Sequence, residues 1–201
     1  MVDERIIHDA QRGDPAAQRA LYEAHYAAAF RLAYLFLQNP GDAEEVVQDA
    51  FVYLLRNLDR YDGEKGTFWA WLRVTLVSRC RNKRRRQQPP LVSLEGMEAT
   101  GRFLVDPNAA NDPARALENR GARRAIWQAL QQVSEGAREA IILRFYEGLA
   151  YADIARILDC SPEAARARVA HGKLQLRRLL DEGEERRAPQ GHPVETARAA
   201  G

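Results

Sequence analysis

A stretch rich in helix-breaking residues divides the 201-residue chain into two parts. Prolines stand at positions 89, 90, 107 and 113, and glycines at positions 96 and 101. Proline removes a backbone hydrogen-bond donor and stops a helix, so residues 89–113 cannot form one long helix. A structureless segment of about 25 residues is too long for a loop inside one compact domain. The sequence therefore predicts two domains joined by an acidic, flexible linker.

Both flanking segments have the spacing of amphipathic helices. Apolar residues recur every three or four positions from Leu21 to Leu37 and from Val46 to Leu58, and again after residue 113. No long stretch alternates with the period of two that is typical of a strand, so the sequence predicts an all-α fold. Residues that accept hydrogen bonds from a helix N-terminus precede these segments. The predicted helix starts are Asp14, Asp42, Thr67, Ser134 and Ser161.

Charge is unevenly distributed although the net charge is only +2. Residues 1–78 carry eight basic and twelve acidic side chains, residues 79–86 carry six basic and no acidic ones, and the remainder balances. A dense basic block beside an acidic domain indicates two different partners, one of which is a polyanion. A solvated charged surface without a partner is the alternative.

Residues 151–173 have the spacing of a helix-turn-helix. A short helix over residues 151–158 is followed by a tight turn and by Ser161-Pro162, which starts a second helix. Small Ala155 stands where the two helices cross. The second helix carries donors suited to base edges and phosphates in the major groove. These donors are Arg166, Arg168, His171, Lys173, Arg177 and Arg178.

Aromatic residues precede the basic block within the helix predicted from residue 67. Rings beside a basic strip are what single-stranded nucleic acid requires. Phe68 and Trp71 lie three residues apart and share one face, so we expect both in the core. Trp69 falls on another face, and we expect it to be the exposed ring.

The placement of cysteines, histidines and apolar residues argues against several functional classes. Cys80 and Cys160 are isolated and the four histidines are scattered, so no metal site, cofactor or catalytic cluster is predicted. No run approaches about 18 apolar residues, and the N-terminus lacks the features of a signal peptide. We expect a cytoplasmic protein that is not an enzyme and does not insert into a membrane.

Several motifs, in order, resemble the extracytoplasmic-function (group IV) family of bacterial RNA polymerase sigma factors. Residues 42–51 (DAEEVVQDAF) are similar to region 2.2 of that family, and residues 67–72 (TFWAWL) with the basic block are similar to regions 2.3 and 2.4. Residues 129–158 resemble region 4. The resemblance implies a region 2 domain over residues 1–88, a linker over 89–113, a region 4 domain over 114–180 and a disordered tail over 181–201.

The resemblance also implies partners and site residues. It implies binding to the β′ clamp and β flap of core RNA polymerase, to duplex and melted promoter DNA, and to an anti-sigma factor. Polymerase docking falls on Glu45, Gln48, Asp49 and Tyr53. Binding of the −10 element falls on Trp69, Trp71, Ser78, Arg79, Arg81, Asn82, Arg84 and Arg85. Binding of the −35 element falls on Glu163, Ala164, Arg166, Ala167, Arg168, His171 and Lys173.

The chain departs from the family pattern at both DNA-binding segments. Ser78 stands where the family usually has asparagine, and Ala164 and Ala167 replace residues with hydroxyl groups. His171 and Gly172 replace the common Arg-Ala pair. Two alternatives remain beside the sigma factor: a stand-alone helix-turn-helix regulator that binds duplex DNA as a dimer, and an enzyme acting on nucleic acid. The regulator has no use for an acidic docking helix, and the enzyme lacks a catalytic cluster.

Overall fold

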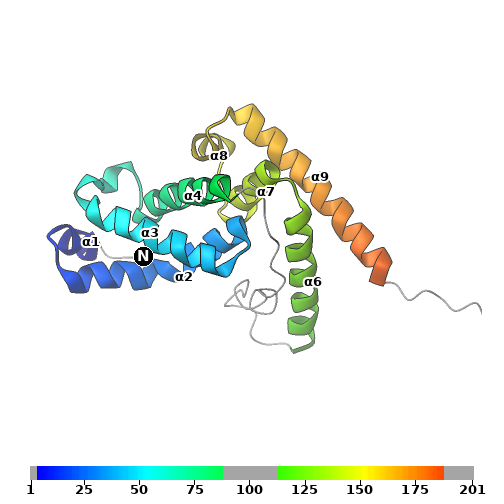
Figure 1. Ribbon diagram of the computed structural model, residues 1–201, viewed down its shortest axis with the longest axis horizontal. Coiled ribbons are helices and arrows are strands. Elements are labelled where there is room, and N and C mark those ends of the chain that lie inside the picture. The colour runs from blue at the N-terminus through cyan, green and yellow to red at the C-terminus, as the bar shows by residue number, and fades with distance from the viewer. Residues whose placement is uncertain (1–3, 88–112, 188–201) are drawn as a thin grey trace, which may run out of the picture.

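The computed structural model describes residues 4–87 and 113–187, and every regular element within these ranges is helical. Two helical units, one before and one after the gap, confirm the predicted all-α, two-domain fold (Figure 1). The predicted flexible linker falls almost entirely on residues outside the described ranges, as does the tail beyond residue 187.

The N-terminal unit consists of α1 (Glu4–Gln11), α2 (Pro15–Leu37), α3 (Pro40–Arg56) and α4 (Phe68–Arg86), with short 3₁₀ turns at Leu58–Arg60 and Gly63–Lys65. Asp14 and Thr67 cap their helices as predicted, because their side chains accept hydrogen bonds from the Ala16 and Ala70 amides. The prediction of Asp42 as a cap was wrong. Asn39 caps α3 instead and accepts a hydrogen bond from the Asp42 amide at 3.0 Å.

The apolar stripes of α2, α3 and α4 meet in the centre of this unit. Burial of such side chains removes apolar surface from water and is the main source of stability. The largest fully buried side chains here are Phe36, Phe51, Leu21, Leu32, Leu54, Leu72 and Leu76. The polar faces of α3 and α4 are left on the outside of the packed helices.

The C-terminal unit consists of α6 (Pro113–Gln132), α7 (Glu135–Ile141), a π-helical turn (Ile142–Tyr146), α8 (Tyr151–Leu158) and α9 (Pro162–Arg187). Ser134 precedes α7, but its hydroxyl contacts Oε1 of Gln175 at 3.0 Å and does not cap the helix. The last helix is longer than predicted, since α9 continues through residues 181–187, which the sequence assigned to a disordered tail.

Helices α7 and α9 approach each other closely at Gly172. A Cβ atom at this position would lie 2.5 Å from Cδ1 of Ile141 and 3.1 Å from the carbonyl oxygen of Ala137. Such distances are below van der Waals contact, so any larger residue would force Ile141 and the Ala137 carbonyl to shift, and the close packing of α7 on α9 favours glycine here. The departure from the family pattern at position 172 therefore has a structural reason.

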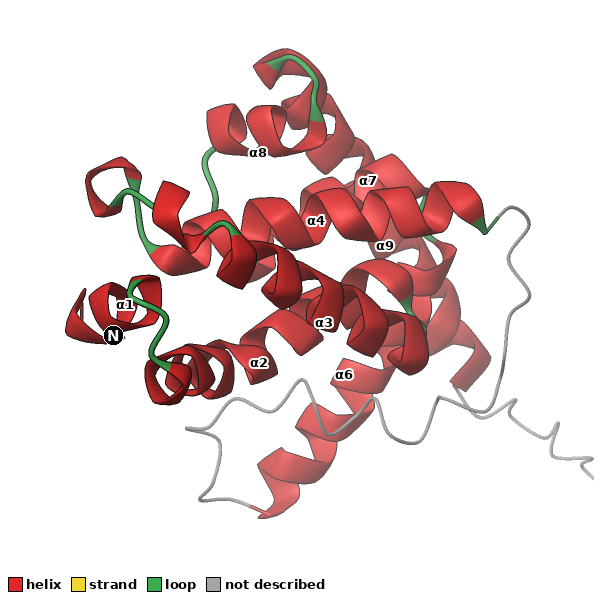
Figure 2. Ribbon diagram, turned by 60° about the vertical axis from the view of Figure 1, so that its left-hand side comes forward, coloured by secondary structure: helices red, strands yellow, loops and turns green. Residues whose placement is uncertain are grey.

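The two units pack against each other and share one continuous cluster of buried residues (Figure 2). The indole ring of Trp127 in α6 stacks on Tyr34 of α2, with ring centroids 4.8 Å apart and planes 7° from parallel. Helix α8 lies beside α4. The C-terminal unit thus covers part of the surface of α4.

Candidate nucleic-acid interface

The outer face of α3 presents the four residues predicted to dock on polymerase. Glu45, Gln48, Asp49 and Tyr53 are all exposed, because the buried Val46, Val47, Ala50, Phe51 and Leu54 turn the opposite face inward. Asp49 lies 3.8 Å from Arg79 of α4, and Glu45 pairs with Lys83. The face is therefore open to a partner and bordered by basic side chains.

The C-terminal half of α4 carries the basic block. Ser78, Asn82 and Arg85 are exposed, and the Asn82 side chain accepts a hydrogen bond from Arg85 one turn later. Arg79 stacks over the ring of Tyr53, 5.2 Å from its centroid. Arg81 and Arg84 are half-buried because carboxylates of the C-terminal unit lie against them.

The burial of two of the three aromatic residues at the start of α4 differs from the prediction. Phe68 is buried as expected, but Trp71 is only half-buried and stacks on Tyr61 with a centroid distance of 5.8 Å. Trp69 is not an exposed ring. It is half-buried between the units, and its indole N–H donates to Oε2 of Glu147 at 3.0 Å.

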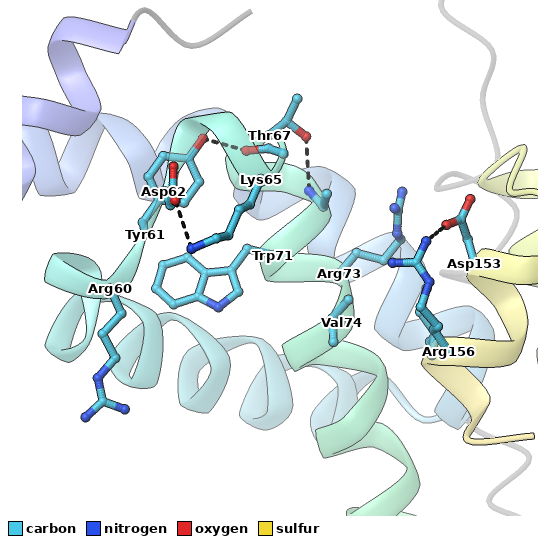
Figure 3. A pocket seen from close by; sticks show the side chains of 13 residues that line it. Arg60, Tyr61, Asp62, Lys65, Thr67, Trp71, Arg73, Val74, Asp153 and Arg156 are labelled. Atoms are coloured by element: carbon cyan, nitrogen blue, oxygen red, sulfur yellow. Dashed lines mark hydrogen bonds and ion pairs between the residues drawn. The ribbon is translucent and has the colours of Figure 1, made fainter.

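A cleft of about 520 Å³ lies where the start of α4 meets the preceding loop and α8 (Figure 3). Trp71 forms one side, and Tyr61 hydroxyl donates to the Gly66 carbonyl at 3.0 Å, which fixes the loop. Four cationic side chains also line it: Arg60, Lys65, Arg73 and Arg156. An aromatic ring with surrounding cations suits a nucleotide. The loop residues were not predicted as part of the site, although a charged, glycine-containing loop directly before two tryptophans was a signal for them.

The helix-turn-helix forms as predicted from α8 and α9. Asp159 adopts a left-handed conformation with φ of 51°, which turns the chain sharply between the helices. The Ser161 hydroxyl accepts a hydrogen bond from the Ala164 amide at 3.1 Å, so Ser161 caps α9. Ala155 and Ala165 are both buried, and these small residues allow the two helices to pack closely.

The first turns of α9 present most of the residues predicted to contact the −35 element. Arg166 lies over the ring of Tyr151 at 5.3 Å, and Lys173 lies 6.0 Å from the Phe145 ring centroid. Arg168 is half-buried, and its guanidinium packs near Gly136 of α7. Ala164 is half-buried, whereas Glu163, Arg166, Ala167, His171 and Lys173 are exposed.

Neither a metal centre nor a membrane span is found in the part of the chain that the structure describes. Within residues 4–87 and 113–187, no three His, Cys, Asp or Glu side chains gather as metal ligands do. No helix in these ranges is long and apolar enough to cross a bilayer. Burial raises the pKa of the Cys80 thiol, so this cysteine is protonated and unreactive at neutral pH.

Two family models match the two helical units. Residues 21–89 match Sigma-70 region 2, and residues 123–176 match Sigma-70, region 4. Together the two matches span more than half of the chain, in the order expected from the motifs. The chain belongs to the extracytoplasmic-function (ECF) sigma factors. This confirms the family predicted from sequence, and the alternative of a stand-alone regulator has no better support. The ECF sigma factors are transcription initiation factors.

Relatives of this ECF sigma factor match over most of its length. The RNA polymerase sigma-H factor of Pseudomonas aeruginosa is 27% identical over 183 residues, which cover 89% of this chain and 93% of the relative. The ECF RNA polymerase sigma-E factor of Escherichia coli K12 is 27% identical over 175 residues, or 84% of this chain and 89% of the relative. The solved structure of CnrH in complex with the cytosolic domain of CnrY is similar with a TM-score of 0.60 and 25% identity, and covers 90% of this chain and 99% of that one.

Proposed function

We propose that this chain is an alternative sigma factor that binds core RNA polymerase, directs it to promoters through −10 and −35 elements and helps to melt the DNA. The observation that carries the proposal is the match of both units to sigma regions, in a chain that also has an exposed acidic face on α3 and basic side chains on α4 and α9. As an initiation factor it works with the active site of polymerase, so we propose no catalytic residue, metal or cofactor and a cytoplasmic location.

The exposed face of α3 is the proposed docking site on the β′ clamp. Glu45, Gln48, Asp49 and Tyr53 lie on one side of the helix and are exposed. Complementary charge speeds the encounter of two proteins and fixes their orientation. The acidic character of this face suits a basic or mixed partner surface. The C-terminal unit is proposed to contact the β flap.

Helix α4 and the cleft beside it are the proposed site for the melted −10 element. Melted strands expose base faces, which stack on aromatic side chains, while basic residues follow the backbone phosphates. We assign the phosphates to Arg79, Arg81, Arg84 and Arg85, and base contacts to Trp69, Trp71, Ser78 and Asn82. The cleft lined by Trp71 and Tyr61 is the proposed place for one unpaired base.

The N-terminal half of α9 is the proposed reader of the −35 element. A helix in the major groove reads bases through side chains near its N-terminus and holds phosphates beside them. Arg166, His171 and Lys173 are exposed donors, with Glu163, Ala164, Ala167 and Arg168 around them. Alanine methyl groups offer contact to thymine methyl groups, so the −35 sequence is expected to be unlike that of relatives with hydroxyl groups here.

The anti-sigma partner is also a proposal. The similar protein CnrH was solved in complex with the cytosolic domain of CnrY. We propose that a partner of this kind covers the polymerase-docking and DNA-binding faces of this chain. The domain bounds predicted from sequence are retained for these roles, with region 2 over residues 1–88 and region 4 over 114–180.

Run-off transcription tests the proposed function. Core RNA polymerase is supplied with a genomic promoter library, with and without this protein. We expect defined transcripts only when both proteins are present, and the start sites give the −10 and −35 sequences. Binding of duplex DNA by the protein alone, with no binding to core polymerase, would instead establish the stand-alone regulator.

A further inference from the structure

The ring of Tyr151 lies against two arginine side chains of the C-terminal unit. Cζ of Arg166 in α9 is 5.3 Å from the ring centroid, and Cζ of Arg144 in the π-helical turn is 4.9 Å from it. Tyr151 is the first residue of α8, the helix that packs on α9. A cation over a tyrosine ring is attracted by the negative face of the ring. Three elements of the unit therefore meet at one aromatic side chain.

Arg144 is held against this ring by the backbone. It is half-buried, and its Nη1 donates a hydrogen bond to the carbonyl oxygen of Leu149 at 2.7 Å. The Leu149 amide in turn donates to the Leu143 carbonyl at 3.1 Å, so both backbone groups of Leu149 are bonded in the loop before α8. The Tyr151 ring therefore has a fixed neighbour from the π-helical turn.

Arg166 has little besides this ring to fix its side chain. It is exposed, and no hydrogen bond or ion pair joins its guanidinium to another residue in the described ranges. Glu163 lies one turn earlier on α9. The pKa of its carboxyl is lowered first by its own backbone amide and by the Ser161 hydroxyl, and less by the charge of Arg166. The carboxylate of Glu163 thus belongs to the helix start, and the Tyr151 ring is the contact that orients Arg166.

An aromatic contact of this kind orders an arginine side chain before DNA binds. A free arginine populates many rotamers, and ordering such a side chain during binding lowers the affinity. Reading a base also requires aligned N–H groups, because the specific contact of arginine with guanine is bidentate. A ring restrains the guanidinium through its face and leaves these N–H groups open to a base edge.

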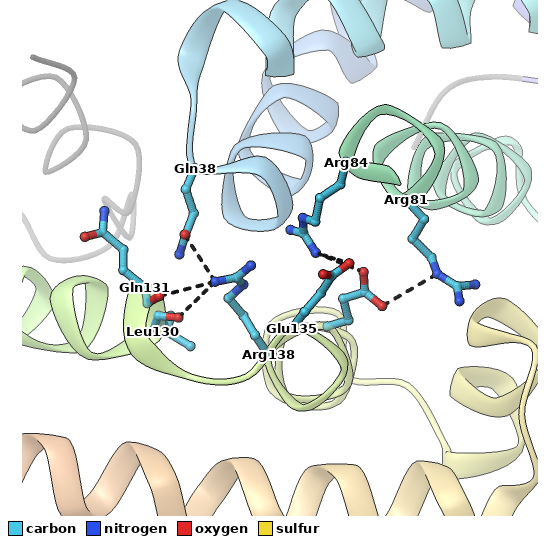
Figure 4. Close-up of polar contacts among 8 residues, drawn as sticks. Gln38, Arg81, Arg84, Leu130, Gln131, Glu135 and Arg138 are labelled. Atoms are coloured by element: carbon cyan, nitrogen blue, oxygen red, sulfur yellow. Dashed lines mark hydrogen bonds and ion pairs between the residues drawn. The ribbon is translucent and has the colours of Figure 1, made fainter. Parts of the chain in front are cut away.

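Carboxylates restrain an arginine in a different way. Glu135 and Glu139 of α7 hold Arg84 and Arg81 of α4 through their N–H groups (Figure 4). A guanidinium held in this way has fewer N–H groups left for a base. The aromatic contact at Tyr151 is therefore suited to an arginine that reads DNA.

We propose that Tyr151 is a positioning residue for the −35 element, whose ring orients Arg166 toward a base and so determines how strongly α9 discriminates at that base pair. The inference rests on the proposed role of α9. In this role Tyr151 acts through Arg166, and its hydroxyl group is not needed. The sequence singled out Arg166 but not Tyr151, because the two residues lie on different helices.

Binding of −35 duplex by the full chain tests this role, with fluorescence anisotropy as the measurement. Tyr151→Leu removes the ring and should weaken binding about fivefold, which is the scale of ordering one flexible side chain. Tyr151→Phe keeps the ring without its hydroxyl and should bind as wild type does. The preference for the cognate base pair at the position read by Arg166 should fall by the same factor in Tyr151→Leu, while preferences at other positions stay.

The Arg166→Ala background separates positioning from a purely structural role. In this background Tyr151→Leu should cause no further loss of affinity, because the side chain that the ring positions is absent. Tyr146→Leu removes another tyrosine ring of the same unit, 42% exposed, and is the matched control that should leave the base preference unchanged. A fivefold loss from Tyr151→Leu in both backgrounds, or an equal loss in Tyr151→Phe and Tyr151→Leu, would overturn the proposal.

NMR of the free protein tests the contact without DNA. Protons over the face of an aromatic ring resonate upfield, so the Arg166 side-chain signals should move downfield in Tyr151→Leu and stay in place in Tyr151→Phe. Unchanged signals in Tyr151→Leu would overturn this inference alone. Unchanged −35 binding by Arg166→Ala would overturn the proposed role of α9 together with the inference.

Discussion

The two proposed DNA-binding helices differ in what lies against their basic side chains. Arg81 and Arg84 of α4 face carboxylates of the other unit, whereas Arg166 and Lys173 of α9 face aromatic rings of their own unit. A ring contacts the face of a guanidinium and leaves its N–H groups for an acceptor, while a carboxylate occupies those groups. The guanidinium groups of Arg81 and Arg84 are therefore occupied, while that of Arg166 is available to an acceptor.

The largest expected effect comes from loosening the unit that covers α4. Gly172→Ala places a methyl group against Ile141 and the Ala137 carbonyl, and overpacking of this kind costs about 1–3 kcal/mol. Denaturant unfolding should show this loss in the C-terminal unit. Gly183→Ala is the matched control on the same helix, where a Cβ meets nothing within 4 Å, and alanine should stabilise it by about 0.5–1 kcal/mol. Equal stability of the two variants would contradict the close packing at Gly172.

Substitutions in α9 test whether its basic side chains are available to bind DNA. Arg166→Ala should weaken binding of −35 duplex by about 1–3 kcal/mol if this side chain reads a base. Arg168→Ala should cost less, because the Arg168 guanidinium packs beside Gly136 of its own unit. Arg177→Ala, further along α9, is the control and should lower affinity only slightly. Fluorescence anisotropy on the mapped promoter measures all three, and unchanged binding by Arg166→Ala would show that α9 does not read the −35 element through this residue.

A charge reversal on α3 tests whether its exposed face binds core polymerase. Asp49→Arg should weaken binding to core polymerase about tenfold, since a like charge replaces a complementary one at the interface. The side chain is 62% exposed, so the fold should be unaffected. Glu23→Arg on α2 provides a control of equal charge change at another exposed position. Size-exclusion chromatography with core polymerase compares the two, and equal binding would place the docking face elsewhere.

The smallest expected effect is a pH dependence at Glu139. Its pKa is raised in the folded protein by burial, with Arg84, Arg81 and Arg138 opposing and Glu135 adding to the rise. Its contribution to stability is therefore present below the ordinary carboxyl pKa and is lost as pH rises through the raised value. The stability of Glu139→Gln relative to wild type should increase with pH across this window. A difference that stays constant would show that Glu139 is not buried in solution.

The sequence predicted the helices well where local chemistry decides them. Asp14, Thr67 and Ser161 cap helices because their side chains lie next to the amides that they satisfy. The prediction that Asp42 caps α3 was wrong because Asn39, an equally good cap followed by proline, starts the helix earlier. Ser134 does not cap α7 as predicted, because its hydroxyl contacts Gln175, 41 residues away. Contacts so distant in sequence leave no local pattern.

The residues of the candidate site also fall into those whose surroundings were predictable from local sequence and those whose surroundings were not. The exposure of Asp49 and Arg166 was predictable, because each lies opposite a buried stripe of its own helix. The covering of Trp69 and Arg84 was not, since their partners Glu147 and Glu139 lie 78 and 55 residues later. Periodicity tells which face of a helix is polar. It does not tell whether another domain of the same chain binds that face.

Binding of two promoter fragments to the free, wild-type protein tests this difference between the units most directly. The fragments are the −35 duplex and the single-stranded −10 oligonucleotide, measured at one salt concentration with and without core polymerase. We expect core polymerase to increase the affinity for the −10 strand much more than that for the −35 duplex. An equal gain for both fragments, or full −10 affinity in the free protein, would contradict it.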